Sequence, residues 1–464
     1  MAAVSRRLPV FDRRRAGVLL HPTALPGERG AFGAAGRAFI DWLSNAGFSV
    51  WQVLPLGPVS ESRSPYWTRS DFALDTQFID CTEAADPQQQ RDVFSAFCEG
   101  NEHWLEDYAL FVALREDCGG AAWWDWPAPL RERESAALAA ARQRLARRLE
   151  QLRTEQWQAA RQLAALREYA QQRAIRLFGD LPIYVPPDSA TAWAHPEQLQ
   201  LTATGKPALL AGVPPDYFSA DGQLWGYPLY DWKQAQRDHF AFWRMRLRPQ
   251  LALFDVLRID HFRGLVDFWA VLPDAANARA GAWHAAPGHA LLEALRRDWP
   301  DLPLVAEDLG NITEAVGALR REFGLPGMRV LQFAFDGMPG NPHLPHNIDR
   351  DAVAYTGTHD NDTTLGWYRA LDDVARQRVD FLLRSDLVPM PEALLRAALA
   401  SAASLAVIPI QDLLGLGSEA RFNTPGTVAG NWRWKLWHGA LDNGLAGWCR
   451  ALNEAYGRAI HVSE

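Results

Sequence analysis

The sequence of 464 residues is 48% hydrophobic and 22% charged, a balance that is typical of globular proteins and excludes a mainly disordered chain. Its formal net charge of −8 argues against a broad nucleic-acid-binding surface. No apolar run reaches the roughly 18 residues of a membrane span, so we expect no membrane partner.

The N-terminal segment is basic, but the apolar stretch that follows it, residues 16–20, is too short for the hydrophobic region of a signal peptide. The cysteines show no CxxC spacing, which predicts reduced thiols in a cytoplasmic protein. They are Cys81, Cys98, Cys118 and Cys449.

Apolar segments of strand length recur along the chain, and most end in polar residues or in Gly and Pro. Several lack alternation of polar and apolar residues, as expected for strands buried on both faces of a parallel sheet. Helical patterns, such as residues 289–299 and 312–324, lie between many of them. This alternation predicts a parallel α/β fold, and eight units favour a closed (β/α)8 TIM barrel over an open sheet. The predicted strands are 16–22, 50–57, 175–185, 256–262, 303–310, 329–335, 353–360 and 405–415.

We expect residues 1–464 to form a single catalytic barrel with helical and loop insertions between its strands. Residues 58–174 are predicted to be a largely helical insertion, because their later part has no Gly or Pro and is rich in Ala, Arg, Leu and Gln. A second insertion, 186–250, contains AGVPPDYFSADGQLWGYPLY (211–230). Its Pro, Gly and Asp residues predict a structured loop rather than a helix, and its aromatic residues favour a place in a substrate groove.

Polar residues follow most of the predicted strands, and active sites of (β/α)8 barrels lie at the C-terminal ends of the strands. Carboxylates come from at least four strands, and no serine or cysteine recurs among these residues. The sequence therefore predicts an acidic cup with few basic groups. Its candidate members are His21, Asp180, Arg258, Asp260, Glu307, Asp308, His359, Asp360, Gln411 and Asp412.

Two short motifs suggest other chemistry. DNDTT (360–364) resembles the start of a calcium loop but lacks the Gly at position 6 and the Glu at position 12. GLGSEA (415–420) fits a dinucleotide-binding pattern, yet no further strand-helix-strand unit follows it. We therefore expect neither a protein-bound catalytic metal nor a dinucleotide.

Paired carboxylates are the groups that glycoside chemistry requires, one as the nucleophile and one as the proton donor. Asp260 and Glu307 lie on the fourth and fifth predicted strands, which are neighbours in a barrel, and Arg258 lies on the same strand face as Asp260. A guanidinium would keep Asp260 ionised, whereas the apolar residues before Glu307 would favour its protonated form. Asp360 could bind sugar hydroxyls. A buried structural ion pair is the alternative for Arg258 and Asp260, and for His261 packing is as plausible as ligand binding.

The chain has 20 tryptophans and 10 tyrosines. A large core would account for these aromatic residues. A long groove in which flat rings stack on sugars would account for them equally well.

Nine segments resemble the amylomaltases, the 4-α-glucanotransferases of glycoside hydrolase family 77, which is related to the α-amylase clan. They follow the family order across nearly the whole chain. The segments are GVLLHPTALPG (17–27), QVLPLGP (52–58), GDLPIYV (179–185), GVPPDYFSADGQLWG (212–226), RIDHFRG (258–264), AEDLG (306–310), GLPGMRVLQFAF (324–335), YTGTHDNDTTLGWY (355–368) and IPIQDLLGLGSEARFN (408–423).

The resemblance implies transfer of α-1,4-glucan segments between maltooligosaccharide or glucan chains through a covalent glucosyl-enzyme intermediate. It implies Asp260 as nucleophile, Glu307 as acid/base and Asp360 as transition-state stabiliser. It implies no cofactor and no bound metal. The residues implied to contact substrate are Arg258, His359, Asp180, His21, Tyr66, Tyr217, Phe218 and Trp225.

The sequence departs from the usual family pattern at four positions, Trp67, Leu74, Asp75 and Tyr227. These departures affect sugar contacts on the acceptor side and chain-length preference rather than the catalytic assignment. An α-amylase-like retaining hydrolase is the alternative activity, and an inactive glucan-binding protein is the alternative of another class. We expect a monomer or a weak homo-oligomer.

Overall fold

The computed structural model describes residue 8 and residues 10–215, 220–427 and 429–460. Eight parallel strands close into a barrel in the order β1-β12-β11-β10-β9-β6-β3-β2. Each strand overlaps one of the eight segments predicted from the sequence, so the predicted (β/α)8 barrel is confirmed. The strands are β1 (Arg15–Leu19), β2 (Val50–Gln52), β3 (Arg176–Leu181), β6 (Val256–Ile259), β9 (Leu304–Ala306), β10 (Gly327–Val330), β11 (Ala352–Tyr355) and β12 (Leu405–Pro409).

The strands are shorter than predicted at their C-terminal ends. Residues 405–415, predicted as one strand, divide into β12 and the short helix α14 (Ile410–Leu413). Residues 331–335 leave the sheet through a 3-10 helix, Leu331–Phe333. The predicted strands were too long because buried apolar residues continue beyond the ends of the sheet. Leu331 and Ile410, for example, are buried although they lie in short helices.

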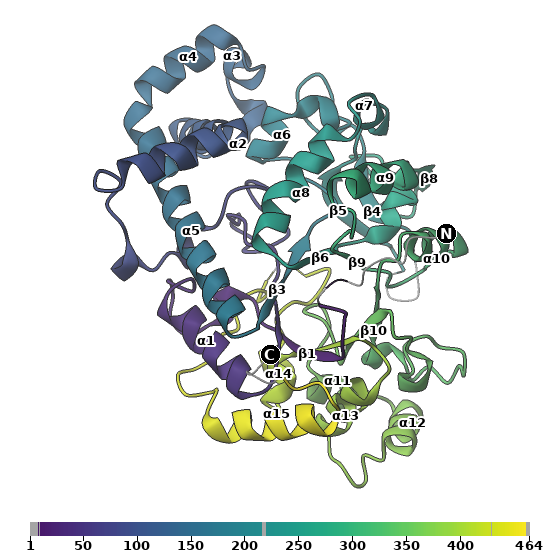
Figure 1. The fold of residues 1–464 in the computed structure, drawn as a ribbon. Coiled ribbons are helices and arrows are strands. Elements are labelled where there is room, and N and C mark those ends of the chain that lie inside the picture. The colour runs from purple at the N-terminus through teal and green to yellow at the C-terminus, as the bar shows by residue number, and fades with distance from the viewer. Residues whose placement is uncertain (1–7, 9, 216–219, 428, 461–464) are drawn as a thin grey trace.

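Helices surround the barrel and cover the outer faces of its strands (Figure 1). The predicted helices at 289–299 and 312–324 are confirmed as α9 and α10. The helices that follow or flank barrel strands are α1 (Ala34–Asn45), α8 (Ala241–Leu253), α9 (Gly288–Asp298), α10 (Glu314–Glu322), α11 (Thr364–Ala370), α12 (Asp373–Leu383), α13 (Glu392–Ala400) and α15 (Asn443–Ala455).

Between β2 and β3 the chain forms four helices that extend to the upper left in Figure 1. They are α2 (Arg91–Asp117), α3 (Ala128–Arg131), α4 (Ser135–Arg144) and α5 (Ala146–Gln172). Buried residues of α2, α4 and α5, with Trp123, Trp126 and Trp193, form a hydrophobic cluster separate from that of the barrel. The C-terminal half of α5 returns to the barrel, where Leu163 and Leu166 join the main core.

A second sheet of four antiparallel strands lies beside the barrel, in the order β5-β4-β7-β8. Its strands are β4 (Leu210–Val213), β5 (Gln223–Pro228), β7 (Asp267–Val271) and β8 (Gly281–Ala285). Residues 211–230 were predicted as a structured loop, and most of β4 and all of β5 fall within them. The high content of Gly and Pro hid these short strands. Helices α6 (Ala190–Ala194) and α7 (Trp232–Arg237) complete the segment between β3 and β6.

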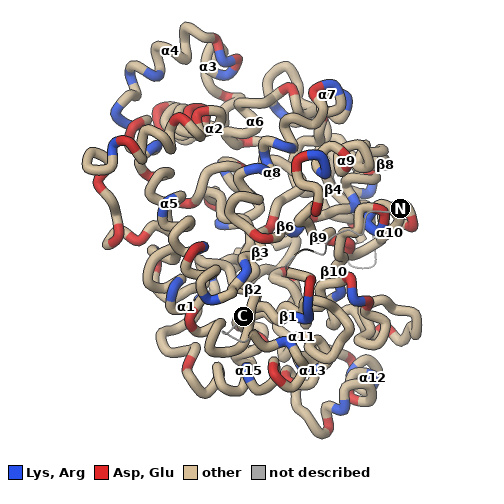
Figure 2. Tube along the Cα trace, in the orientation of Figure 1, with Lys and Arg blue, Asp and Glu red and all other residues tan. Residues whose placement is uncertain are grey.

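Charged residues of both signs are interspersed over the outer surface, including helices α2 to α5 (Figure 2). Many of them pair on these helices, for example Arg153 with Glu106 and Arg148 with Glu116. Within the part of the chain that the structure describes, no helix has the length and apolar character that a membrane crossing requires.

Candidate active site

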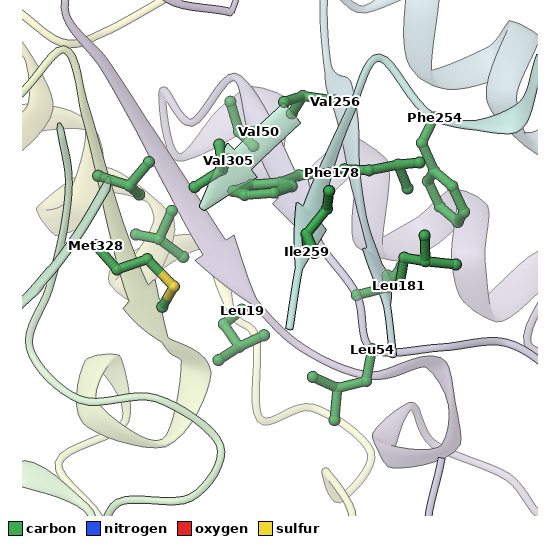
Figure 3. Packing of buried hydrophobic residues seen from close by; sticks show 14 of the residues in the cluster. Leu19, Val50, Leu54, Phe178, Leu181, Phe254, Val256, Ile259, Val305 and Met328 are labelled. Atoms are coloured by element: carbon green, nitrogen blue, oxygen red, sulfur yellow. The ribbon is translucent and has the colours of Figure 1, made fainter. Parts of the chain in front are cut away.

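A polar layer lies above an apolar layer inside the barrel. The apolar residues come from the four neighbouring strands β2, β3, β6 and β9 and lie close together in Figure 3; they are Val50, Phe178, Val256 and Val305. Because side chains alternate between the two faces of a strand, residues two positions further along face the same way. These residues are Gln52, Asp180, Arg258 and Glu307. The sequence thus places polar groups over a hydrophobic floor at the C-terminal ends of the strands.

The guanidinium of Arg258 joins two of the predicted carboxylates. Its Nη1 donates to Oδ1 and Oδ2 of Asp180, at 2.9 and 2.7 Å, and its Nη2 donates to Oδ1 of Asp260 at 2.7 Å. The side chains of Arg258 and Asp180 are 6% and 0% exposed, whereas that of Asp260 is 30% exposed. Arg258 and Asp180 therefore form a buried ion pair beneath the site, and Asp260 is the carboxylate that a ligand can reach.

The backbone turns sharply at His261, which adopts a left-handed conformation with φ 47° and ψ 51°. This turn directs the His261 N–H to Oε2 of Glu307 at 2.7 Å, and the Leu309 N–H donates to Oε1 at 3.0 Å. The end of β6 therefore holds the carboxyl group that follows β9. The strain of a left-handed non-glycine residue is of the kind that clusters at functional sites.

Burial raises the pKa of Glu307 to about 7. Arg258 opposes this rise, the charge of Asp260 adds to it, and the two backbone N–H groups oppose it. At neutral pH a substantial fraction of Glu307 therefore carries a proton. Asp260 contacts a guanidinium directly, whereas Glu307 lies in a less polar place, and this contrast of environments is what separates a nucleophile from a general acid.

Tyr66 connects the ion pair to His359. Its hydroxyl donates to Oδ2 of Asp180 at 2.6 Å and lies 2.9 Å from Nε2 of His359. The two rings stack with centroids 5.3 Å apart and an interplanar angle of 20°. His359 Nε2 is also 3.4 Å from Oδ2 of Asp360. Residues from three separate segments thus form one hydrogen-bonded group around the floor of the cup.

Asp360 lies in the loop after β11, and its side chain is 44% exposed. Its Oδ1 accepts a hydrogen bond from Nδ2 of Asn423 at 2.6 Å, and its backbone carbonyl accepts one from Arg421 at 2.7 Å. Sequence reasoning assigned no role to Asn423 or Arg421. Both belong to the RFN stretch at the end of segment 408–423, and the resemblance of that segment to the family was the available signal.

His21 follows β1 and is buried against two phenylalanines. Its ring centroid is 5.8 Å from that of Phe78 and 6.3 Å from that of Phe422. Burial lowers the pKa of His21 to about 3, and the proximity of His359 lowers it further. His21 and His359 line the same small cavity, together with Arg421. The neutral His21 ring therefore forms part of the cavity wall near His359.

Of the three aromatic residues predicted to line the groove, the structure describes Trp225. Trp225 lies on β5, and its ring meets that of His261 edge to face with centroids 4.7 Å apart. Tyr217 and Phe218 lie outside the described residues. An aromatic residue that sequence reasoning missed is Trp432, whose ring lies 6.0 Å from that of His359 and 6.2 Å from that of Tyr66.

The tryptophans occupy two kinds of place in the structure, near the cup and in the core. Trp67, Trp225 and Trp432 gather around Tyr66, Tyr227, His261 and His359. Eight tryptophans are buried and serve packing: Trp42, Trp51, Trp104, Trp123, Trp126, Trp157, Trp193 and Trp243.

Two strand-end carboxylates are structural. Asp308 accepts a hydrogen bond from the Met328 N–H at 2.7 Å and pairs with Arg329 and Arg320. Asp412 accepts from the Thr356 hydroxyl and from Thr364 at 2.5 to 2.7 Å. The partners of Asp308 lie on β10 and α10, whereas those of Asp412 follow β11 and begin α11. Both carboxylates therefore tie together elements that surround the cup.

The two motifs that suggested other chemistry use their polar groups internally. In DNDTT, Asp362 accepts hydrogen bonds from the Thr363 N–H and the Ser418 hydroxyl. In GLGSEA, Glu419 accepts from the Gly417 N–H. Among the residues described by the structure, no group of three or more His, Cys, Asp and Glu side chains is arranged to hold a metal ion.

Comparison with known proteins gives one consistent result. The family model for 4-alpha-glucanotransferase matches residues 20–91 and 81–439. The chain is 44% identical to the 4-alpha-glucanotransferase of Thermus thermophilus over 492 aligned positions, covering 95% of this chain and 98% of that protein. It is 39% identical to the chloroplastic/amyloplastic 4-alpha-glucanotransferase of Solanum tuberosum, covering 92% of this chain and 82% of that protein.

Comparison with solved structures also finds amylomaltases. The amylomaltase from Streptococcus agalactiae in complex with acarbose superposes with a TM-score of 0.91 at 33% identity, covering 97% of this chain and 100% of that chain. The amylomaltase from Corynebacterium glutamicum gives a TM-score of 0.70 at 18% identity, covering 97% of this chain and 76% of that chain, which is a likeness of fold.

Proposed function

The chain belongs to the 4-alpha-glucanotransferase family, glycoside hydrolase family 77, and from this premise we propose that it transfers α-1,4-glucan segments by a retaining double displacement. Asp260 is the nucleophile, Glu307 the acid/base and Asp360 the transition-state stabiliser. The observation that carries this assignment is the contrast between two neighbouring carboxyl groups, one held by the Arg258 guanidinium and the other with a pKa raised to about 7 by burial.

In the first step a carboxylate oxygen of Asp260 attacks the anomeric carbon of the donor glucan. Oδ1 accepts a hydrogen bond from Arg258, so Oδ2 is the atom that we assign to the attack. The bond between the anomeric carbon and the bridging oxygen breaks as Glu307 transfers its proton to that oxygen. The leaving chain departs with a free 4-hydroxyl, and the rest of the donor remains as an ester on Asp260.

In the second step the 4-hydroxyl of another glucan attacks the same carbon. Glu307, now ionised, takes the hydroxyl proton, and the ester bond to Asp260 breaks. Two inversions give net retention. Asp360, held by Asn423 and close to His359, presents a partly exposed carboxylate that can stabilise the positive charge that develops on the sugar ring.

Transfer requires that the acceptor outcompete water, which is present at about 55 M. Positioning of a bound acceptor can achieve this because effective molarities of well-oriented groups reach about 10⁵ M or more. The residues that we propose to contact the sugars and that lie around the cup are His21, Tyr66, Trp225, Arg258 and His359. We propose that Asp180, whose side chain is buried, acts on the sugars through Tyr66 and Arg258. We also propose contacts from Tyr217 and Phe218, which lie outside the described residues.

Incubation with maltotriose tests the proposal. Transfer gives glucose together with maltotetraose, maltopentaose and longer chains, which chromatography of the products resolves. Hydrolysis without transfer, as in the α-amylase-like alternative, gives only maltose and glucose. Sugar binding without turnover would favour an inactive glucan-binding protein. Either of these last two results would contradict the proposed function.

We also propose that the protein acts in the cytoplasm. The described cysteines Cys81, Cys98, Cys118 and Cys449 are all free thiols, in keeping with a cytoplasmic protein. We propose a monomer or a weak homo-oligomer with maltooligosaccharides and α-1,4-glucans as its partners. We also propose that residues 58–174 form an insertion subdomain of the single barrel domain and that residues 186–250 contribute the wall of the groove.

A further inference from the structure

Tyr66 is at the centre of the cup, yet it lies on a segment with almost no regular structure. Between β2 and α2, residues near Tyr66 form only an isolated bridge between Val59 and Thr68. The Tyr66 hydroxyl must nevertheless stay within hydrogen-bond distance of both Asp180 and His359. Hydrogen bonds within the segment, such as that from the Trp67 N–H to the Ser64 carbonyl at 3.0 Å, shape this loop. The carbonyl of Tyr66 itself accepts its hydrogen bond from outside the segment.

The backbone of Tyr66 is held by Tyr227 of β5. The Tyr227 hydroxyl donates to the Tyr66 carbonyl at 2.8 Å. The ring of Tyr227 stacks on that of Tyr184, with centroids 6.2 Å apart and an interplanar angle of 24°. Burial raises the pKa of Tyr227 well above its ordinary value, and the charge of Asp260 adds to the rise, so the hydroxyl remains a donor. This hydrogen bond ties the second sheet to the floor of the cup.

Trp67 completes the contact from the other side. Its ring lies against that of Tyr227, with centroids 4.8 Å apart. The residue before Tyr227 is Gly226, at φ +80°, and a Cβ atom there would lie only 3.2 Å from Cη2 of Trp67. Glycine suits both the conformation and the close approach. Trp67 and Tyr227 are two of the four positions where the sequence departs from the family pattern, and they touch each other.

We propose that Tyr227 is a positioning residue for the transfer reaction, which fixes Tyr66 through the hydrogen bond to its carbonyl, and that Trp67 holds Tyr227 in place. The proposal rests on the proposed function, because Tyr66 matters to the chemistry only if the cup binds the donor sugar. Through Tyr66 the contact keeps Asp180 and Arg258 in the arrangement that directs the second arm of the guanidinium to Asp260.

A double-mutant cycle tests this assignment, because residues that act through one another give non-additive effects. Tyr227→Phe removes only the hydroxyl and keeps the ring. We expect it to lower kcat for maltotriose disproportionation about five- to tenfold, with little change in KM. A decrease of this size corresponds to the free energy of one neutral hydrogen bond. In the Tyr66→Phe background, where the hydroxyl to be positioned is gone, the same substitution should lower kcat less than about twofold.

Tyr230→Phe is the control, since the Tyr230 hydroxyl also donates to a backbone carbonyl, that of Ile183 at 2.5 Å, and accepts from Arg246 at 2.6 Å, away from Tyr66. It should lower the melting temperature and have the same effect on kcat in both backgrounds. Trp67→Gln provides a second perturbation of the contact, should Tyr227→Phe not fold, and the same non-additivity with Tyr66→Phe is expected.

Two results would overturn the proposal: wild-type kcat in Tyr227→Phe, or an equal loss of kcat in the two backgrounds. Failure of the proposed function is a separate outcome. In that case the wild-type protein itself would produce no ladder of longer oligomers from maltotriose, whereas the two results above arise with an active wild-type enzyme.

Discussion

The Nη2 atom of Arg258 lies 2.7 Å from Oδ1 of Asp260, while Nη1 of the same guanidinium contacts the buried carboxylate of Asp180. One planar group thus anchors itself in the interior and presents its other arm to the partly exposed nucleophile. Only arginine has the forked set of donors that this requires, because lysine carries a single compact charge.

We therefore predict that Arg258→Lys lowers kcat/KM about 100-fold or more, since an ammonium cannot contact Asp180 and Asp260 together in this geometry. Initial rates of glucose release from maltotriose measure the effect. The control is Arg244→Lys, because Arg244 also donates from two nitrogen atoms, here Nε and Nη2, but to the single carboxylate of Asp298 away from the cup. If Arg258→Lys retained wild-type kcat/KM, the guanidinium would not be needed to orient Asp260.

Asp260→Asn should abolish turnover, with kcat reduced by about 10³-fold or more, because an amide oxygen is a poor nucleophile while its shape and its contact with Arg258 are preserved. Sugar binding, measured by calorimetry with maltotriose, should persist. Asp267→Asn is the matched control, since Asp267 also pairs with an arginine and its side chain is 28% exposed, close to the 30% of Asp260. Unchanged turnover in Asp260→Asn would refute the assigned nucleophile.

The main features of this site could be predicted from the sequence because they follow from strand geometry. Apolar runs indicated the strands, and parallel strands bring their C-terminal ends to one edge of the barrel. Asp260 and Glu307 follow the neighbouring strands β6 and β9, so the order of the strands along the chain was enough to predict their proximity. The period of two likewise placed Arg258 on the same face as Asp260.

The rest depended on loops, where no periodicity indicates which residues meet. Asn423 contacts Asp360 across 63 positions of sequence, and Tyr227 contacts Tyr66 across 161. The second sheet was not predicted because its β4 and β5 are short and interrupted by Gly and Pro. The pKa of Glu307 could be anticipated in direction from Leu304, Val305 and Ala306, but its N–H partners could not.

The pKa of Glu307 predicts the pH dependence of activity. The first step needs protonated Glu307, and the protonated fraction falls about tenfold for each pH unit above the pKa. With the pKa raised to about 7, kcat/KM for maltotriose should be level below neutrality and should decline above pH 7. Rates measured between about pH 5 and pH 9 will show this limb.

Maltosyl fluoride separates this role of Glu307 from a purely structural one. Fluoride leaves without needing a proton, so the decline above neutrality should be weaker with this substrate. Glu307→Ala should lose maltotriose cleavage by about 10³-fold, yet release fluoride at a much higher relative rate. An equal loss with both substrates would indicate that the substitution damages the site rather than removing a proton donor.

Arg458 stabilises the end of the barrel opposite to the cup. Its guanidinium is buried and donates to four backbone carbonyls, those of Arg15, Leu399, Ser401 and Ala403, at 2.7 to 3.0 Å. It thus ties the C-terminal segment to the start of β1 and to the residues before β12. Arg458→Met would leave these carbonyls without their charged donor, and we expect a loss of about 3–5 kcal/mol in the free energy of unfolding.

Arg450→Met is the comparison that tests this reasoning. Arg450 donates to the carbonyls of Ser44 and Asn45, but its side chain is 32% exposed and water can replace the lost bonds. Its substitution should cost about 1 kcal/mol. Denaturant unfolding of both variants gives the two values, and kcat of the folded protein should stay near wild type because neither residue reaches the cup. Equal losses in the two variants would show that burial of Arg458 adds nothing to its bonds.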